Sequence, residues 1–216
     1  MPRPSADGSE QAIDWAIENK VDIINISAGF EEYHKDIDMA IKKATLAVPE
    51  ILIFAAAGNW GNTMPVAFPA RLTDNVFCIF SYSGKLRVIK DTNPNPVGDG
   101  PNFALLGQDV APNPASNKKE SGTSIACAIA TGLAGRILDF VRQDDVKRGL
   151  RLSEENREKV GTKNGMTRIF RQMSNQDPPY LCVAPWQMLP GGSFIRNRQG
   201  TRAEIYGTIE RCFWNA

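Results

Sequence analysis

The 216-residue sequence predicts an α/β protein with a mostly parallel sheet and helices on both faces. Apolar runs of strand length occupy residues 51–57 and 76–80, and residues 21–26 form an almost unbroken run of β-branched residues. Amphipathic helical patterns alternate with these runs. Runs without polar alternation indicate strands buried on both faces, as in parallel sheets. Right-handed crossovers between such strands place helices over both faces, which makes three layers.

The elements follow in order along the chain. Ser9 is a suitable N-cap for a first helix, whose apolar face carries Ala12, Ile13, Ala16 and Ile17. A second amphipathic helix, carrying Ile37, Ala40, Ile41 and Ala44, is expected to end before Pro49. Turn residues are frequent in residues 84–119, which we expect to be a loop. The run of small and apolar residues from Ser124 to Leu138 predicts a long buried helix that ends near Val141.

The composition turns charged after Gln143, which indicates a boundary. We therefore divide the chain into a domain of residues 1–142 and an extension of residues 143–216. In the extension we expect short helices at 154–160 and 166–173, followed by irregular structure. The extension carries no motif that indicates a role.

Composition argues against several functional classes. The net charge of +1 argues against binding nucleic acid or a membrane surface through bulk electrostatics. The first residues have no apolar core typical of a secretory signal, and no apolar run approaches the ~20 residues of a membrane span. One histidine and four widely spaced cysteines make a metal site improbable, and no cofactor is indicated. This reduced set of cysteines slightly favours an intracellular location.

Three segments carry candidate chemistry. Ser124 follows Gly122-Thr123 at the start of the long helix, where unpaired N–H groups and the helix dipole stabilise developing negative charge. Asn59 follows the second apolar strand, and its side-chain amide is a donor suited to an oxyanion. Small residues at 27–29 end the first strand. Simpler alternatives exist, because Ser124 also suits an N-cap, Asn59 a turn, and the alanines before it close helix–sheet packing.

These segments, in this order, resemble the subtilisin-like serine peptidases over residues 7–141. The resemblance implies a partial subtilisin-like fold in which Ser124 is the nucleophile and Asn59 donates to the oxyanion. It also implies a specificity pocket with one wall formed by Ser27, Ala28 and Gly29. The opposite wall would be Ala56, Ala57 and Gly58. The implied partner is a polypeptide substrate.

The family's catalytic aspartate and histidine have no counterpart before residue 21. The only histidine, His34, follows the first strand among polar residues and suits a helix start better than a catalytic base. Three hypotheses remain open. The chain is part of a peptidase whose base comes from an upstream domain, a non-catalytic peptide-binding descendant, or a fragment without function. In each case we expect this chain alone to be inactive, because a serine hydroxyl is a weak nucleophile without a base.

Overall fold

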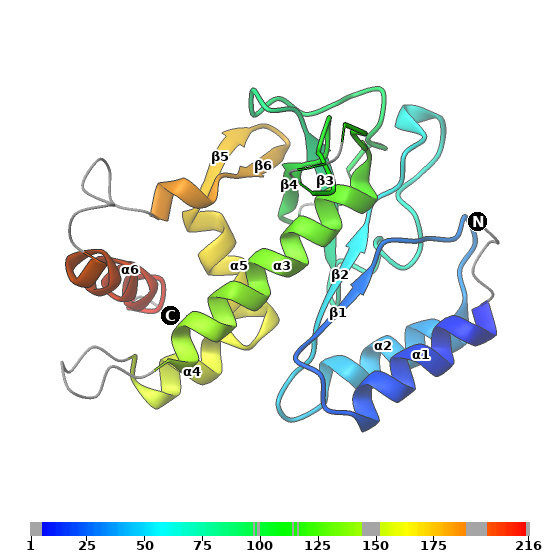
Figure 1. The fold of residues 1–216 in the computed structure, drawn as a ribbon. Coiled ribbons are helices and arrows are strands. Elements are labelled where there is room, and N and C mark those ends of the chain that lie inside the picture. Colours follow the sequence, from blue (N-terminus) through cyan, green and yellow to red (C-terminus); the bar gives the residue numbers. More distant parts are fainter. Residues whose placement is uncertain are drawn as a thin grey trace.

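The computed structural model describes residues 6–143 except 97, 99, 114 and 116, and residues 152–188 and 198–214. One six-stranded sheet, in the order β1-β2-β3-β4-β6-β5, forms its centre (Figure 1). The strands are β1 (Ile23–Ile26), β2 (Leu52–Ala56), β3 (Phe77–Tyr82), β4 (Asn102–Leu106), β5 (Ser174–Asp177) and β6 (Tyr180–Val183). Every neighbouring pair is parallel except β5 and β6. The predicted mostly parallel sheet is therefore confirmed.

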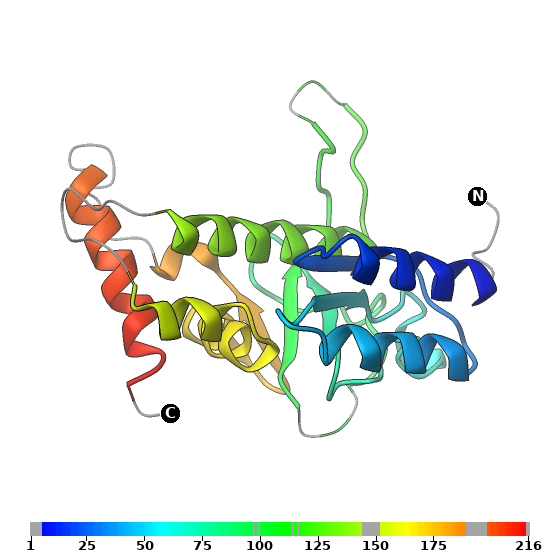
Figure 2. The same ribbon diagram turned by 90° about the horizontal axis from the view of Figure 1, so that it is seen from below.

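Six α-helices surround the sheet in the described residues. They are α1 (Ala6–Glu18), α2 (Lys35–Thr45), α3 (Thr123–Arg142), α4 (Glu154–Val160), α5 (Lys163–Gln172) and α6 (Arg198–Arg211). Short 3₁₀ helices occupy Gly61–Thr63 (η1) and Pro185–Met188 (η3). Figure 2 shows α1 and α2 on one side of the strands and α4 and α5 on the other, with α6 at the end of the molecule away from α1.

The strand register explains which helix covers which face. It pairs Asn25 with Phe54, and Phe54 with Phe77, so these side chains share one face. Phe170 of α5 packs against Phe54 and Phe77, with ring centroids 6.0 Å apart in both pairs. Helix α3 packs along β1, β2, β3 and β4, over the same face as α5. The other face, which includes Ile24, is turned toward α1 and α2.

Helix α3 is the central helix of the molecule. Small buried residues, Ala126, Ala130 and Ala134, bring it close to the sheet. Its length and composition would suffice to cross a bilayer, as is true of many core helices of soluble proteins. Here it packs along four strands of the sheet, so its apolar character is explained by core packing.

Three local predictions were wrong. Ser9 lies inside α1, which begins by Ala6, so Ser9 is not its N-cap. Strand β4 lies within the segment expected to be a loop. The prediction missed it because the strand has only five residues and directly follows a segment rich in turn residues. The segment expected to be irregular after residue 173 contains β5, β6 and α6. Strand β6 pairs with β4 in the same sheet, although the domain boundary after residue 142 stays a prediction.

Candidate active site

The site lies where α3 begins, at the carboxyl ends of β1 and β2. Gly122 precedes α3 with φ of +137°, a conformation that favours glycine. A Cβ on Gly122 would lie 3.0 Å from Nδ2 of Asn59, so the missing side chain also makes room for this amide. The backbone N–H of Gly122 donates to the carbonyl of Gly107 at 2.7 Å, which anchors the turn that precedes the helix.

Thr123 holds Asn59 in place. The Thr123 backbone N–H donates to Oδ1 of Asn59 at 2.7 Å, and the Thr123 hydroxyl lies 3.0 Å from the same oxygen. That hydroxyl also accepts from the N–H of Gly58 at 3.1 Å. Because Oδ1 of Asn59 serves as the acceptor toward α3, Nδ2 is the end of the amide that remains for donation beside Gly122.

Ser124 and Ser27 form a reciprocal pair of hydrogen bonds. The Ser124 hydroxyl donates to the Ser27 carbonyl at 3.0 Å, and the Ser27 hydroxyl donates to the Ser124 carbonyl at 3.1 Å. These contacts join the end of β1 to the first turn of α3. The predicted nucleophile is half-buried, and in this arrangement its proton is held by a backbone carbonyl.

Residues 67–68 contact both of the predicted pocket walls. The N–H of Ala67 donates to the carbonyl of Ala57 at 2.8 Å, and Phe68 pairs with Phe30 just after Gly29. A Cβ on Gly29 would lie only 2.6 Å from Cβ of Ala67, so that wall requires glycine at this point. Residues 67–68 thus contact one predicted wall at Gly29 and the other at Ala57.

Two further side chains could have supplied chemistry. His34 lies at the N-cap of α2. The centroid of its ring is 4.5 Å from that of Phe30 and 6.0 Å from that of Phe68. His34 does not take part in the hydrogen bonds of Ser124 described above. Burial raises the pKa of the Cys127 thiol to about 12, so the reactive thiolate is not populated near neutral pH. Ser124 is therefore the better candidate nucleophile.

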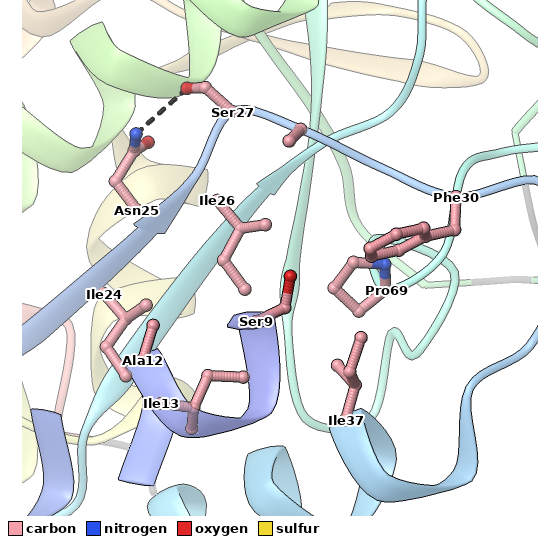
Figure 3. A pocket seen from close by; sticks show the side chains of 11 residues that line it. Ser9, Ala12, Ile13, Ile24, Asn25, Ile26, Ser27, Phe30, Ile37 and Pro69 are labelled. Carbon is pink, nitrogen blue, oxygen red and sulfur yellow. Dashed lines mark hydrogen bonds between the residues drawn. The ribbon is translucent and has the colours of Figure 1, made fainter. Parts of the chain in front are cut away.

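An apolar cavity of about 220 Å³ lies beside β1, on the face away from α3 (Figure 3). Ile24 and Ile26 of β1 point into it. The rest of its lining comes mainly from α1, α2 and nearby loops: Ser9, Ala12, Ile13, Phe30, Ile37 and Pro69. Strand β1 ends the sheet of the described residues, so one edge of its backbone is unpaired there.

Residues 4–149 match the family model of the subtilases, Peptidase_S8. The chain belongs to this family. The match confirms the predicted resemblance and makes the chain a relative of serine peptidases, which are hydrolases. Among curated proteins, this subtilase chain is 30% identical over 183 residues to the subtilisin-like protease het-Q2 of Podospora anserina, covering 76% of the chain and 48% of that protein.

A second relative is the minor extracellular protease Epr of Bacillus subtilis (strain 168), which is 28% identical over 151 residues. That alignment covers 69% of this chain and 22% of Epr. The subtilase chain thus spans about half, or less, of the length of these two relatives.

Solved structures show the same fold. The prenylagaramide maturation protease PagA superposes with a TM-score of 0.63 at 20% identity, over 97% of this subtilase chain and 68% of PagA. The PatG macrocyclase in complex with a peptide gives a TM-score of 0.61 at 16% identity, over 97% of this chain and 57% of the other. At these identities the likeness establishes the fold alone.

The structure brings Ser124 next to Ser27 and brings Asn59 to the start of α3, and the roles that the subtilase resemblance implies for these residues stay predictions. Sequence reasoning missed the hydroxyl of Thr123, although its position between Gly122 and Ser124 could have drawn attention to it. It also missed Asn25 and Thr131, whose side chains meet across 106 residues of sequence. In the described residues, no three His, Cys, Asp or Glu side chains gather as metal ligands would, and the predicted lack of a cofactor stays a prediction.

Proposed function

We propose that this chain carries the nucleophile and oxyanion site of a serine-type endopeptidase. The single observation that supports it best is the position of Asn59: Thr123 anchors its Oδ1 at 2.7 Å, one residue before Ser124. An amide donor held next to a hydroxyl at a helix N-terminus suits acyl transfer, since both act on the same carbonyl group.

In the proposed reaction, Ser124 Oγ attacks the carbonyl carbon of the scissile peptide bond. A base takes the hydroxyl proton and returns it to the leaving amine as the C–N bond breaks. Asn59 Nδ2 and the N–H of Ser124 donate to the oxygen that becomes negative. Water then hydrolyses the acyl–serine ester, which releases the second product and restores the hydroxyl.

The base is the missing part of this site. The Ser124 hydroxyl donates to the Ser27 carbonyl, and a carbonyl oxygen does not remove a proton at neutral pH. We propose that an additional segment, an upstream domain of the same protein, supplies a histidine and its aspartate. The unpaired edge of β1 and the apolar cavity beside Ile24 and Ile26 are the surfaces on which such a segment would pack.

The test begins with the reading frame upstream of the codon for Met1 in the natural transcript. The longest frame and this chain are expressed separately and treated with a fluorophosphonate, which labels an activated serine. We expect labelling of Ser124 in the longer protein, none in this chain, and none in either Ser124→Ala variant. Asn59→Ala in the longer protein should lower kcat roughly 10²–10³-fold, the cost of one oxyanion donor established on subtilisin itself.

A non-catalytic peptide-binding protein is the second candidate. The observation that favours it is the same hydrogen bond from Ser124 to Ser27, in which the hydroxyl faces a carbonyl oxygen and not a base. If the longest frame binds peptides but neither labels nor cleaves them, the second candidate replaces the first.

A further inference from the structure

Asn25 of β1 makes a set of contacts that the proposed reaction does not use directly. Its Nδ2 donates to the Ser27 hydroxyl at 2.9 Å. Its Oδ1 faces α3, where the Thr131 hydroxyl lies at 3.0 Å and the Cys127 thiol at 3.2 Å. Figure 3 shows the Asn25 and Ser27 side chains directed toward each other, joined by their hydrogen bond.

The direction of these hydrogen bonds is fixed by counting hydrogens. The Ser27 hydroxyl has one hydrogen, which it donates to the Ser124 carbonyl at 3.1 Å. It must therefore accept from Asn25, so the NH₂ end of that amide faces Ser27 and the oxygen faces α3. The oxygen then faces the Cys127 thiol and the Thr131 hydroxyl, whose single hydrogen is shared between Asn25 Oδ1 at 3.0 Å and the Cys127 carbonyl at 2.9 Å.

This series of hydrogen bonds leads from Asn25 through Ser27 to Ser124. The Ser27 hydroxyl is held between Asn25 and the Ser124 carbonyl, and the Ser27 carbonyl receives the Ser124 hydroxyl at 3.0 Å. Without the amide donor, the Ser27 hydroxyl would be free to rotate away from the Ser124 carbonyl. The first turn of α3 would then lose one of its two bonds to β1, and the nucleophile would lose part of its orientation.

We infer that Asn25 is a positioning residue for Ser124, acting through Ser27. The inference rests on the proposed function, because a position matters for catalysis only if Ser124 reacts. It assigns a role to a side chain of β1 that does not contact Ser124 directly and reaches it only through Ser27. A residue that merely ties β1 to α3 would affect stability without affecting the chemical step.

The test uses the longest natural reading frame and two substitutions. Asn25→Asp keeps an acceptor for Thr131 and removes the donor to Ser27, whereas Asn25→Leu removes both. We expect each to lower kcat and the rate of fluorophosphonate labelling roughly 10- to 100-fold with KM nearly unchanged, since small misplacements of reacting groups have such effects. Ser27→Ala should give a similar loss, and the Asn25→Asp, Ser27→Ala double variant should lose little more.

The control is Asn19→Asp, at the end of α1. Asn19 also donates its Nδ2 to an oxygen, the Trp15 carbonyl at 2.8 Å, so the same amide and the same charge are changed far from Ser124. This variant should keep the wild-type labelling rate.

The outcomes separate the inference from the function on which it rests. If the wild-type frame labels and Asn25→Asp labels equally fast, the role of Asn25 is refuted and the peptidase proposal stands. If Asn25→Asp loses thermal stability but keeps kcat, the residue is only a structural tie, and the inference also fails. If the wild-type frame does not label, the peptidase proposal fails and the role of Asn25 fails with it.

Discussion

Replacing Thr123 by valine tests the connection that holds Asn59. Valine has nearly the same shape but lacks the hydroxyl, which accepts from the Gly58 N–H at 3.1 Å and lies 3.0 Å from Oδ1 of Asn59. Thr123 is fully buried, so water does not readily replace the lost partner. The Gly58 N–H is left unsatisfied, which costs about 1–3 kcal/mol.

We therefore expect Thr123→Val to lower the free energy of unfolding by about 2 kcal/mol. For a chain of this size, each kcal/mol corresponds to about 2–4 °C, so the thermal midpoint should fall by roughly 4–8 °C. Circular dichroism during urea and thermal unfolding measures both quantities. Thr208→Val is the control, because the Thr208 hydroxyl donates to the Glu204 carbonyl on the exposed surface of α6. We expect this substitution to change the free energy of unfolding by no more than about 0.5 kcal/mol.

An unchanged midpoint for Thr123→Val would refute the reasoning, since it would mean that the hydroxyl contacts do not hold Gly58 and Asn59. A fall of similar size in Thr208→Val would refute it as well, because the loss would then reflect valine in a helix and not the site.

Three further predictions concern other parts of the molecule. Gly122→Ala should lower the free energy of unfolding by about 1–3 kcal/mol in thermal unfolding, because Gly122 has a positive φ. Gly132→Ala in α3 should raise it by roughly 0.5–1 kcal/mol, because a Cβ there meets open space. Equal effects of the two substitutions would contradict the role given to the positive φ of Gly122. Phe170→Ala should lower the free energy of unfolding by about 3–5 kcal/mol in urea, and a negligible change would show that α5 does not belong to the core. The Arg142 guanidinium lowers the pKa of Asp22, so this carboxylate stabilises the fold above its unfolded pKa of about 3.9, and the stability is lost as the pH falls through the lower folded pKa. Unfolding curves should show Asp22→Asn less stable than wild type at pH 7 and equal to it at pH 2; a constant difference would argue against the ion pair.

Strand β2 could be predicted because its whole sequence is apolar. Phe54 and its neighbours in β2 have no polar alternation, so only a central position in a covered sheet suits them. Strand β4 could not be predicted in the same way, since Asn102–Leu106 is short and follows many turn residues. The pairing of β6 with β4 depends on packing between distant segments, which local patterns do not report.

The candidate site was partly predictable for a similar reason. Ser124 and Asn59 stand in segments with recognisable local patterns, and the order of these segments indicated the family. The contacts that orient them are not local: Thr123 meets Asn59 across 64 residues, and Thr131 meets Asn25 across 106. Spacing along the chain does not indicate such pairs, because the strand and helix positions must first be known.

The bonds between Ser27 and Ser124 span 97 residues of sequence, and this separation has a kinetic consequence. Contacts between distant residues require the closure of a long loop, whose entropic cost slows their formation. Helix α3 can begin to coil early, but its first serine acquires its neighbours only when β1 has docked. In the proposed peptidase, the Ser124 hydroxyl would therefore be oriented only once β1 has docked against α3.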